Sequence, residues 1–105
     1  MQQNDENILN QIRTKIHALA PNARAVLFGS RARGDAKPSS DWDILVLLDK
    51  EKIELSDHDK IAYPLFELGW KFDLNFSVKL YTQKEWASRH FTLFYKNVEK
   101  EGIAL

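Results

Sequence analysis

The chain contains 105 residues, with 15 acidic and 15 basic side chains and no cysteine. A chain of this length suits one domain, so we expect residues 1–105 to form a single unit. The zero net charge argues against nucleic-acid binding over the whole surface, since such proteins are usually basic. The absence of cysteine excludes disulfides, cysteine-ligated zinc and thiol catalysis.

The amino-terminal residues are polar and acidic, unlike a signal peptide with its basic start and apolar core. The longest aliphatic run, Ile44 to Leu48, is far shorter than the ~20 residues that a membrane helix needs. Together with the lack of cysteine, these features predict a cytoplasmic protein.

The first predicted element is a helix from about Asp5 to Leu19. Its apolar residues recur at three- and four-residue steps on one face: Ile8, Leu9, Ile12, Ile16 and Leu19. A strand from about Arg24 to Phe28 should follow, because an apolar run ends there at Gly29.

The turn after this strand combines small and basic residues: Gly29, Ser30, Arg31 and Arg33. Small residues at a strand end let backbone N–H groups converge on an anion. A second strand, from Asp41 to about Leu48, opens with Asp41 and Asp43, whose carboxylates project from one face because they are two residues apart. Paired carboxylates suit a hard cation, so the two features together predict a site for a metal-bound triphosphate.

A second helix should start near Ser56 and be kinked by Pro64. A third strand is predicted from Phe72 to Tyr81, where apolar and polar residues alternate. Its polar face carries Asp73 and Asn75. This alternation indicates an antiparallel sheet with one face under helices and the other open.

Two helices close the chain. Thr82 to Glu85 forms a capping box that opens a short helix, and a last helix runs from about Thr92 to Glu101, with Gly102 in the C′ position. The expected fold is therefore α+β: a small mixed or antiparallel sheet with helices packed on one face and the site on the other.

One stretch of the sequence resembles a known family. The string GSRARG at Gly29–Gly34, followed by SDWD at Ser40–Asp43, with ten residues between Ser30 and Asp41, is similar to the minimal nucleotidyltransferases of the DNA polymerase beta-like superfamily. The resemblance implies a nucleotidyltransferase-like fold and metal-dependent transfer of a nucleoside monophosphate to an acceptor hydroxyl. AMP from ATP is the favoured donor group by the same resemblance.

The resemblance also implies residue roles. Gly29 and Ser30 would bind the β- and γ-phosphates, with Arg31 or Arg33 neutralising phosphate charge. The paired carboxylates at positions 41 and 43 would bind Mg²⁺ or Mn²⁺ and serve catalysis. A third carboxylate on the adjacent strand normally completes the site.

Asp73 is the candidate for that third role, as a catalytic residue and metal ligand with Asp41 and Asp43. Asn75 lies one step further along the same predicted strand face and is the alternative occupant. The register of the strand decides between the two, and a site without Asp73 would bind metal and nucleotide but catalyse poorly.

The resemblance implies a partner as well. Minimal nucleotidyltransferases are often paired with a HEPN-type helical protein, and the pair can work as antitoxin and toxin. The alternative interpretation is a catalytically weak or inactive binding module that neutralises a partner by contact. A carbohydrate, antibiotic or other small-molecule acceptor also stays open, as does homo-oligomerisation.

Overall fold

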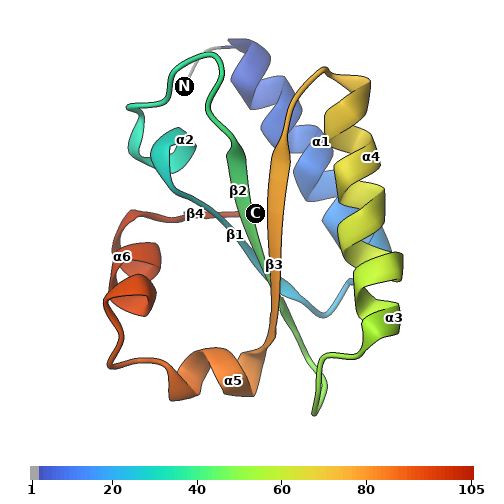
Figure 1. The fold of residues 1–105 in the computed structure, drawn as a ribbon, viewed down its shortest axis with the longest axis vertical. Coiled ribbons are helices and arrows are strands. Elements are labelled where there is room, and N and C mark those ends of the chain that lie inside the picture. The colour runs from blue at the N-terminus through green and yellow to red at the C-terminus, as the bar shows by residue number, and fades with distance from the viewer. Residues whose placement is uncertain (1–2) are drawn as a thin grey trace.

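A four-stranded mixed sheet forms the centre of the structure, a computed structural model that describes residues 3–105 (Figure 1). The strands are β1 (Arg24–Phe28), β2 (Trp42–Leu48), β3 (Phe76–Thr82) and β4 (Ile103–Ala104). Their order is β3-β2-β1-β4, with β2 and β3 parallel and β1 antiparallel to both β2 and β4. The helices are α1 (Gln3–Leu19), α2 (Ser30–Arg33), α3 (Leu55–Asp57), the π-helical turn η1 (His58–Ala62), α4 (Tyr63–Lys71), α5 (Gln83–Ser88) and α6 (Leu93–Glu101). The predicted α+β class with a mixed sheet is confirmed.

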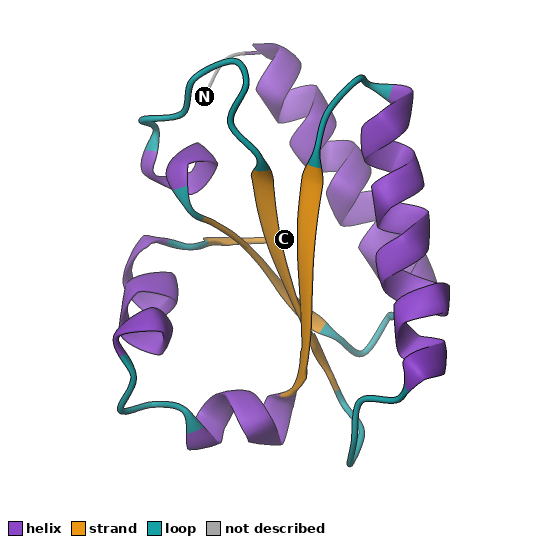
Figure 2. Cartoon of the chain, in the orientation of Figure 1, coloured by secondary structure: helices purple, strands orange, loops and turns teal. Residues whose placement is uncertain are grey.

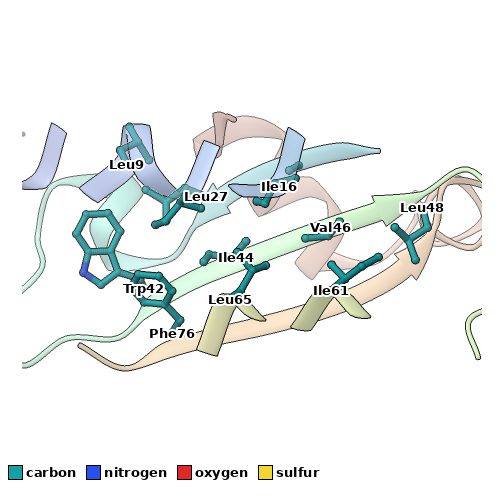
Figure 3. Close-up of a cluster of buried hydrophobic side chains, with 12 residues drawn as sticks. Leu9, Ile16, Leu27, Trp42, Ile44, Val46, Leu48, Ile61, Leu65 and Phe76 are labelled. Atoms are coloured by element: carbon teal, nitrogen blue, oxygen red, sulfur yellow. The ribbon is translucent and has the colours of Figure 1, made fainter. Parts of the chain in front are cut away.

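One face of the sheet packs against helices α1 and α4, which lie together on one side of the strands (Figure 2). Alternate residues of β2 point to this face and are buried: Trp42, Ile44, Val46 and Leu48. Figure 3 shows them between Leu9 and Ile16 of α1 and the pair Ile61 and Leu65 of the η1–α4 segment. The apolar stripe of the first helix is therefore its buried face, as its periodicity predicts.

The opposite face of the sheet is covered in part by α5 and α6. Its buried cluster joins three strand residues to one residue from each helix: Val26, Leu45, Leu47, Trp86 and Val98. The Trp86 ring packs on the rings of Phe94 and Tyr95 from α6, with centroid separations of 5.6 and 4.9 Å. The expectation that this face is open is wrong for this part of the sheet. Because β2 is apolar on both faces, it needs cover on both.

The third strand begins later than its alternation predicts. β3 starts at Phe76 and runs parallel to β2, so the antiparallel pairing that its alternation indicated is wrong, while Asp73 lies in the turn after α4 with a left-handed φ of 59°. The Asp73 N–H donates to the Trp70 carbonyl, and the Leu74 N–H donates to the Gly69 carbonyl over 2.8 Å. This pair of bonds is a Schellman helix end with Asp73 at C′. The apolar residues before β3 belong to a helix cap, which alternation alone does not distinguish from a strand.

The helix is irregular next to Pro64. The π-helical turn η1 leads into α4 with helical backbone angles at Ala62, and Pro64, which has no N–H to donate, is the second residue of α4. The helical segment also starts earlier than predicted. Its capping box joins Glu54 to Asp57, not Ser56 to Asp59. Within residues 3–105, no helix combines the length and the hydropathy that crossing a bilayer requires.

Gly102 ends α6 in an extended conformation, with φ −68° and ψ 151°, and not in the left-handed one expected at C′. A Cβ here would overlap the Val26 side chain and the Val98 carbonyl. The glycine is therefore required for close approach, which lets the chain pass into β4 and pair with β1.

Candidate functional site

Gly29 forms the turn between β1 and α2 in a conformation that only glycine adopts readily. Its φ of 75° and ψ of −158° lie where an L side chain is strained. The carbonyl of Gly29 accepts bonds from the N–H groups of Ala32 and Arg33 at 3.1 and 3.0 Å. The N–H groups of Ser30 and Arg31 precede these two at the start of the helix, where backbone N–H groups suit an anion.

This turn lies directly against Asp43. The β1–β2 register pairs Phe28 with Asp43, so the residue after Phe28 is close to that carboxylate. A Cβ on Gly29 would overlap the Asp43 side chain. The predicted phosphate turn and the predicted cation ligand are therefore in contact, because glycine removes the one atom that would separate them.

Asp41 stands beside Asp43 at the start of β2. The Asn75 amide Nδ2 donates to Asp41 Oδ1 over 3.0 Å, and the Trp42 backbone N–H donates to the Asn75 carbonyl over 3.0 Å. Burial and the Asp41 charge raise the pKa of Asp43, while Lys79 and Arg33 act in the opposite direction. The raised pKa of Asp43 reflects first the burial of its carboxylate and second the charge of Asp41, and a bound cation would favour the ionised form of both side chains.

Asp73 is not brought together with this pair. It caps α4, as described above, and within residues 3–105 no three acidic, histidine or cysteine side chains are grouped for metal binding. The residue that lies against Asp41 is Asn75, the alternative left open by the sequence, and the residue opposite Asp43 in β3 is Ser77. The placement of Asp73 on a strand face is thus wrong, because the parallel strand starts three residues later.

The two arginines of α2 have different surroundings. The Arg31 side chain is only 10% exposed; its guanidinium lies 5.0 Å from the Trp42 ring centroid and donates to the carbonyls of Pro38 and Ser40 at 3.1 and 3.0 Å. Arg31 therefore holds the loop that leads to Asp41. Arg33 is exposed, pairs with Asp35 over 3.2 Å, and lies near enough to Asp43 to act on its pKa. Of the two, Arg33 is the better phosphate candidate.

The sequence did not predict that Arg31 supports the loop before Asp41, nor that a cavity lies beside Gly29. The cavity receives residues from both α2 and α6, which are some sixty positions apart in the chain. The only sign of the cavity in the sequence is a three- and four-residue spacing in the last helix, at Phe94, Asn97, Val98 and Glu101. This spacing indicates one face of a helix but does not tell what that face packs against.

A glycine turn against Asp43, on a mixed sheet of this topology, is the arrangement that the sequence resemblance implies for a nucleotidyltransferase domain. The nucleotidyltransferase domain family matches residues 9–105, and the chain belongs to this family. A Methanocaldococcus jannaschii protein, named as a candidate protein adenylyltransferase, is 35% identical over 80 residues, which are 76% of this chain and 75% of that protein.

Solved structures share the fold. A chain from the crystal structure of a toxin-antitoxin with AMP-PNP superposes with a TM-score of 0.64 at 22% identity, covering 90% of this chain and 69% of that one. A chain from a mutant of the toxin-antitoxin MntA-HpeT gives a TM-score of 0.62 at 22% identity, covering 91% and 69%. At this identity, the likeness establishes the nucleotidyltransferase-like fold.

Proposed function

We propose that this chain transfers AMP from ATP to a hydroxyl group of a partner protein, with Mg²⁺ or Mn²⁺ bound by Asp41 and Asp43. The observation that carries the proposal is the contact between the Gly29 turn and Asp43. A triphosphate bound at the turn has its phosphates beside the carboxylate pair. The proposed acceptor is a protein because the relative from M. jannaschii is named for that activity.

The residues present fit a divalent cation. Asp41 and Asp43 supply oxygen ligands, and both the burial of Asp43 and the neighbouring charge of Asp41 raise the pKa of Asp43, an effect that a bound cation would oppose. When bound, the cation neutralises charge on the phosphates and makes the attacking hydroxyl more acidic. Asn75 orients Asp41 through its amide, and Gly29 lets the phosphates approach the pair without a side chain between them.

The reaction itself needs few protein groups. The oxygen of the acceptor hydroxyl forms a bond to the α-phosphorus and its proton passes to water, while the bond from that phosphorus to the bridging oxygen breaks and pyrophosphate leaves. In our proposal, the Gly29–Ser30 turn holds the leaving phosphates and Arg33 balances their charge. Orientation of the reacting groups is then the main contribution of the fold.

The proposed partner is a HEPN-type helical protein that forms a toxin-antitoxin pair with this chain. The support is the family resemblance of the sequence and the toxin-antitoxin proteins that share the fold. In this proposal, AMP transfer to the partner inactivates it.

A second candidate function is favoured by one observation. Asn75, and not a carboxylate, lies against Asp41. A site with two carboxylates supports nucleotide binding but offers no third acid to accept a proton. The chain would then act as a binding module that neutralises its partner by contact.

Transfer of label from ATP labelled at the α-phosphate to a co-purified partner tests the proposal. The double variant Asp41→Asn with Asp43→Asn should lose transfer and Mn²⁺-dependent ATP binding. Asp49→Asn at the other, exposed end of β2 is the matched control and should keep both. Binding that survives in the double variant would refute the assigned ligands. If wild type binds ATP but transfers no label, and both the double variant and Asp49→Asn still neutralise the partner, the binding module is favoured.

A further inference from the structure

The strand beside Asp43 carries a serine and a lysine on the side of the site. β3 runs next to β2, with Ser77 opposite Asp43 and Lys79 opposite Leu45 (Figure 1). Side chains two residues apart on a strand share a face, and register partners on parallel strands point the same way. Ser77 and Lys79 therefore lie on the face of the sheet that carries Asp43, where the sequence resemblance implies a third carboxylate.

The packing of β3 agrees with this assignment of faces. The residues that alternate with Ser77 and Lys79 pack in the core under α1 and α4: Phe76, Val78 and Leu80. Ser77 is half-buried and Lys79 is exposed. The backbone that carries Lys79 is thus fixed by the core, while its side chain is open to a ligand on the site face.

The ammonium of Lys79 can reach the Asp43 carboxylate. Neighbouring strands lie ~4.8 Å apart and a strand rises ~3.3 Å per residue, so the Cα atoms of the two residues are about 8 Å apart. A lysine places its charge at the end of a flexible four-carbon stem. Burial and the charge of Asp41 raise the pKa of Asp43, and the positive charge of Lys79 opposes them. The lysine charge therefore acts on the site.

Lys79 keeps its charge available for a ligand. Within residues 3–105, Lys79 takes part in no ion pair. Arg33, the other cation that acts on Asp43, is paired with two carboxylates, those of Asp35 and Glu101. Lys79 is therefore the cation beside Asp43 that has no acidic partner of its own among these residues.

The strand order puts Lys79 and the phosphate turn on opposite sides of Asp43. β2 lies between β1, which leads into the Gly29 turn, and β3, which carries Lys79. In an in-line displacement, the attacking and leaving oxygens lie on opposite sides of the phosphorus. With the leaving phosphates at Gly29, the acceptor hydroxyl approaches from the side of Lys79.

β3 has no carboxylate for a second cation on this side. Two-metal sites hold their cations about 4 Å apart, one at the attacking oxygen and one at the leaving oxygen. In the part of the chain that the structure describes, no three acidic, histidine or cysteine side chains are grouped for metal binding. An ammonium on the attacking side repels a divalent cation and itself supplies positive charge there.

We propose that the site binds one divalent cation, through Asp41 and Asp43, and that the Lys79 ammonium takes the place of a second cation on the acceptor side. Lys79 then donates to the non-bridging oxygens of the α-phosphate and favours the ionised form of the acceptor hydroxyl. This inference rests on the proposed function, because the acceptor side is defined by the phosphates at Gly29.

Counting bound Mn²⁺ by electron paramagnetic resonance, with one AMP-PNP per chain, tests the stoichiometry. Wild type should bind one Mn²⁺ per chain. Ser77→Asp combined with Lys79→Met puts a carboxylate opposite Asp43 and removes the ammonium, so this double variant should bind two. Lys84→Met, the same change at an exposed lysine of α5, is the matched control and should bind one.

Calorimetry of Lys79→Met alone tests the lysine through two effects of opposite sign. Mn²⁺ without nucleotide should bind about threefold more tightly than to wild type, because a repelling charge is lost. Mn²⁺-AMP-PNP should bind about tenfold more weakly, the scale of one lost charge-assisted hydrogen bond. A merely structural role of Lys79 would weaken both. Lys84→Met should change neither.

The outcomes separate this inference from the proposed function. Two Mn²⁺ per wild-type chain would refute the inference and leave the proposed function intact. Unchanged affinities in Lys79→Met would contradict the position of Lys79, whether or not the double variant folds. Failure of wild type to bind Mn²⁺ or AMP-PNP would refute the proposed function, and the inference with it.

Discussion

The side-chain amide of Asn75 donates a hydrogen bond to Oδ1 of Asp41 across 3.0 Å, joining the chain just before β3 to the chain just before β2. The two strands run in parallel, and their first residues, Trp42 and Phe76, are register partners. Asn75 is thus level with Asp41. Because Asn75 is neutral, it binds the Asp41 carboxylate without adding a negative charge. The site therefore has two acidic side chains, with an amide at the position where a third acid could lie.

Changing Asn75 tests this relationship. Asn75→Ala should weaken Mn²⁺-ATP binding by about tenfold, the lower end of the effect of removing a group that orients a metal ligand. Asn75→Asp should lower the melting temperature without metal, because like charges meet, and should give a larger rise than wild type when Mn²⁺ is added. Asp73→Asn is the control: asparagine tolerates the left-handed conformation, so metal and ATP binding should not change. If Asp73→Asn loses metal or ATP binding, Asp73 is part of the site and its assignment as a helix cap alone is wrong.

Gly29 and Gly34 form a matched pair, because both have a positive φ, of 75° and 85°. A Cβ at Gly34 meets no atom within 4 Å, whereas one at Gly29 overlaps Asp43. Gly34→Ala should therefore cost only the left-handed strain of about 1–2 kcal/mol. Gly29→Ala should cost more in urea unfolding and should also abolish Mn²⁺-ATP binding, since Asp43 must move. Equal stability losses, with ATP binding intact in both, would contradict the close approach.

Arg31 and Arg33 should separate loop stability from phosphate binding. Arg31→Leu removes two hydrogen bonds to carbonyls and the contact with Trp42, so we expect a loss of about 2–3 kcal/mol in the free energy of unfolding. Arg33→Leu, at an exposed site, should change stability by less than about 0.5 kcal/mol and weaken tripolyphosphate binding. Urea unfolding and calorimetry of both variants measure the difference. If Arg33→Leu loses stability and Arg31→Leu weakens tripolyphosphate binding, then Arg33 supports the loop and Arg31 binds phosphate.

Glu99 should make the stability depend on acid pH. The hydrogen-bonded Arg24 guanidinium lowers the pKa of Glu99 from 4.5 to about 2, with help from the Trp86 indole N–H and against the effect of burial. A lowered carboxyl pKa stabilises the fold above the unfolded value of 4.5, and this contribution is lost as the pH falls through about 2. Glu99→Gln should cost about 1 kcal/mol at pH 7 and flatten the decline in stability between these values. The same change at the exposed Glu51 should leave the pH profile of unfolding unaltered.

Local patterns in the sequence were enough for the elements whose signals are local. The three- and four-residue spacing in α1 marks its buried face, and the capping box of Thr82 and Glu85 opens α5 with both reciprocal hydrogen bonds. The GSRARG and SDWD strings also predict the family, because a glycine turn and a carboxylate pair at the start of a strand are short, continuous pieces of chain.

Tertiary structure decided what depends on pairing between distant segments. Asp73 and Asn75 would occupy the same face of an ideal strand. Because β3 starts only at Phe76 and runs parallel to β2 in this register, Asp73 becomes a helix cap and Asn75 becomes the neighbour of Asp41. Arg31 and Arg33 are equally basic in the sequence, and only the position of Trp42 under one of them makes it a loop support. The cavity beside Gly29 likewise exists because β4 pairs with β1 and carries α6 back to the turn, a contact that no local pattern contains.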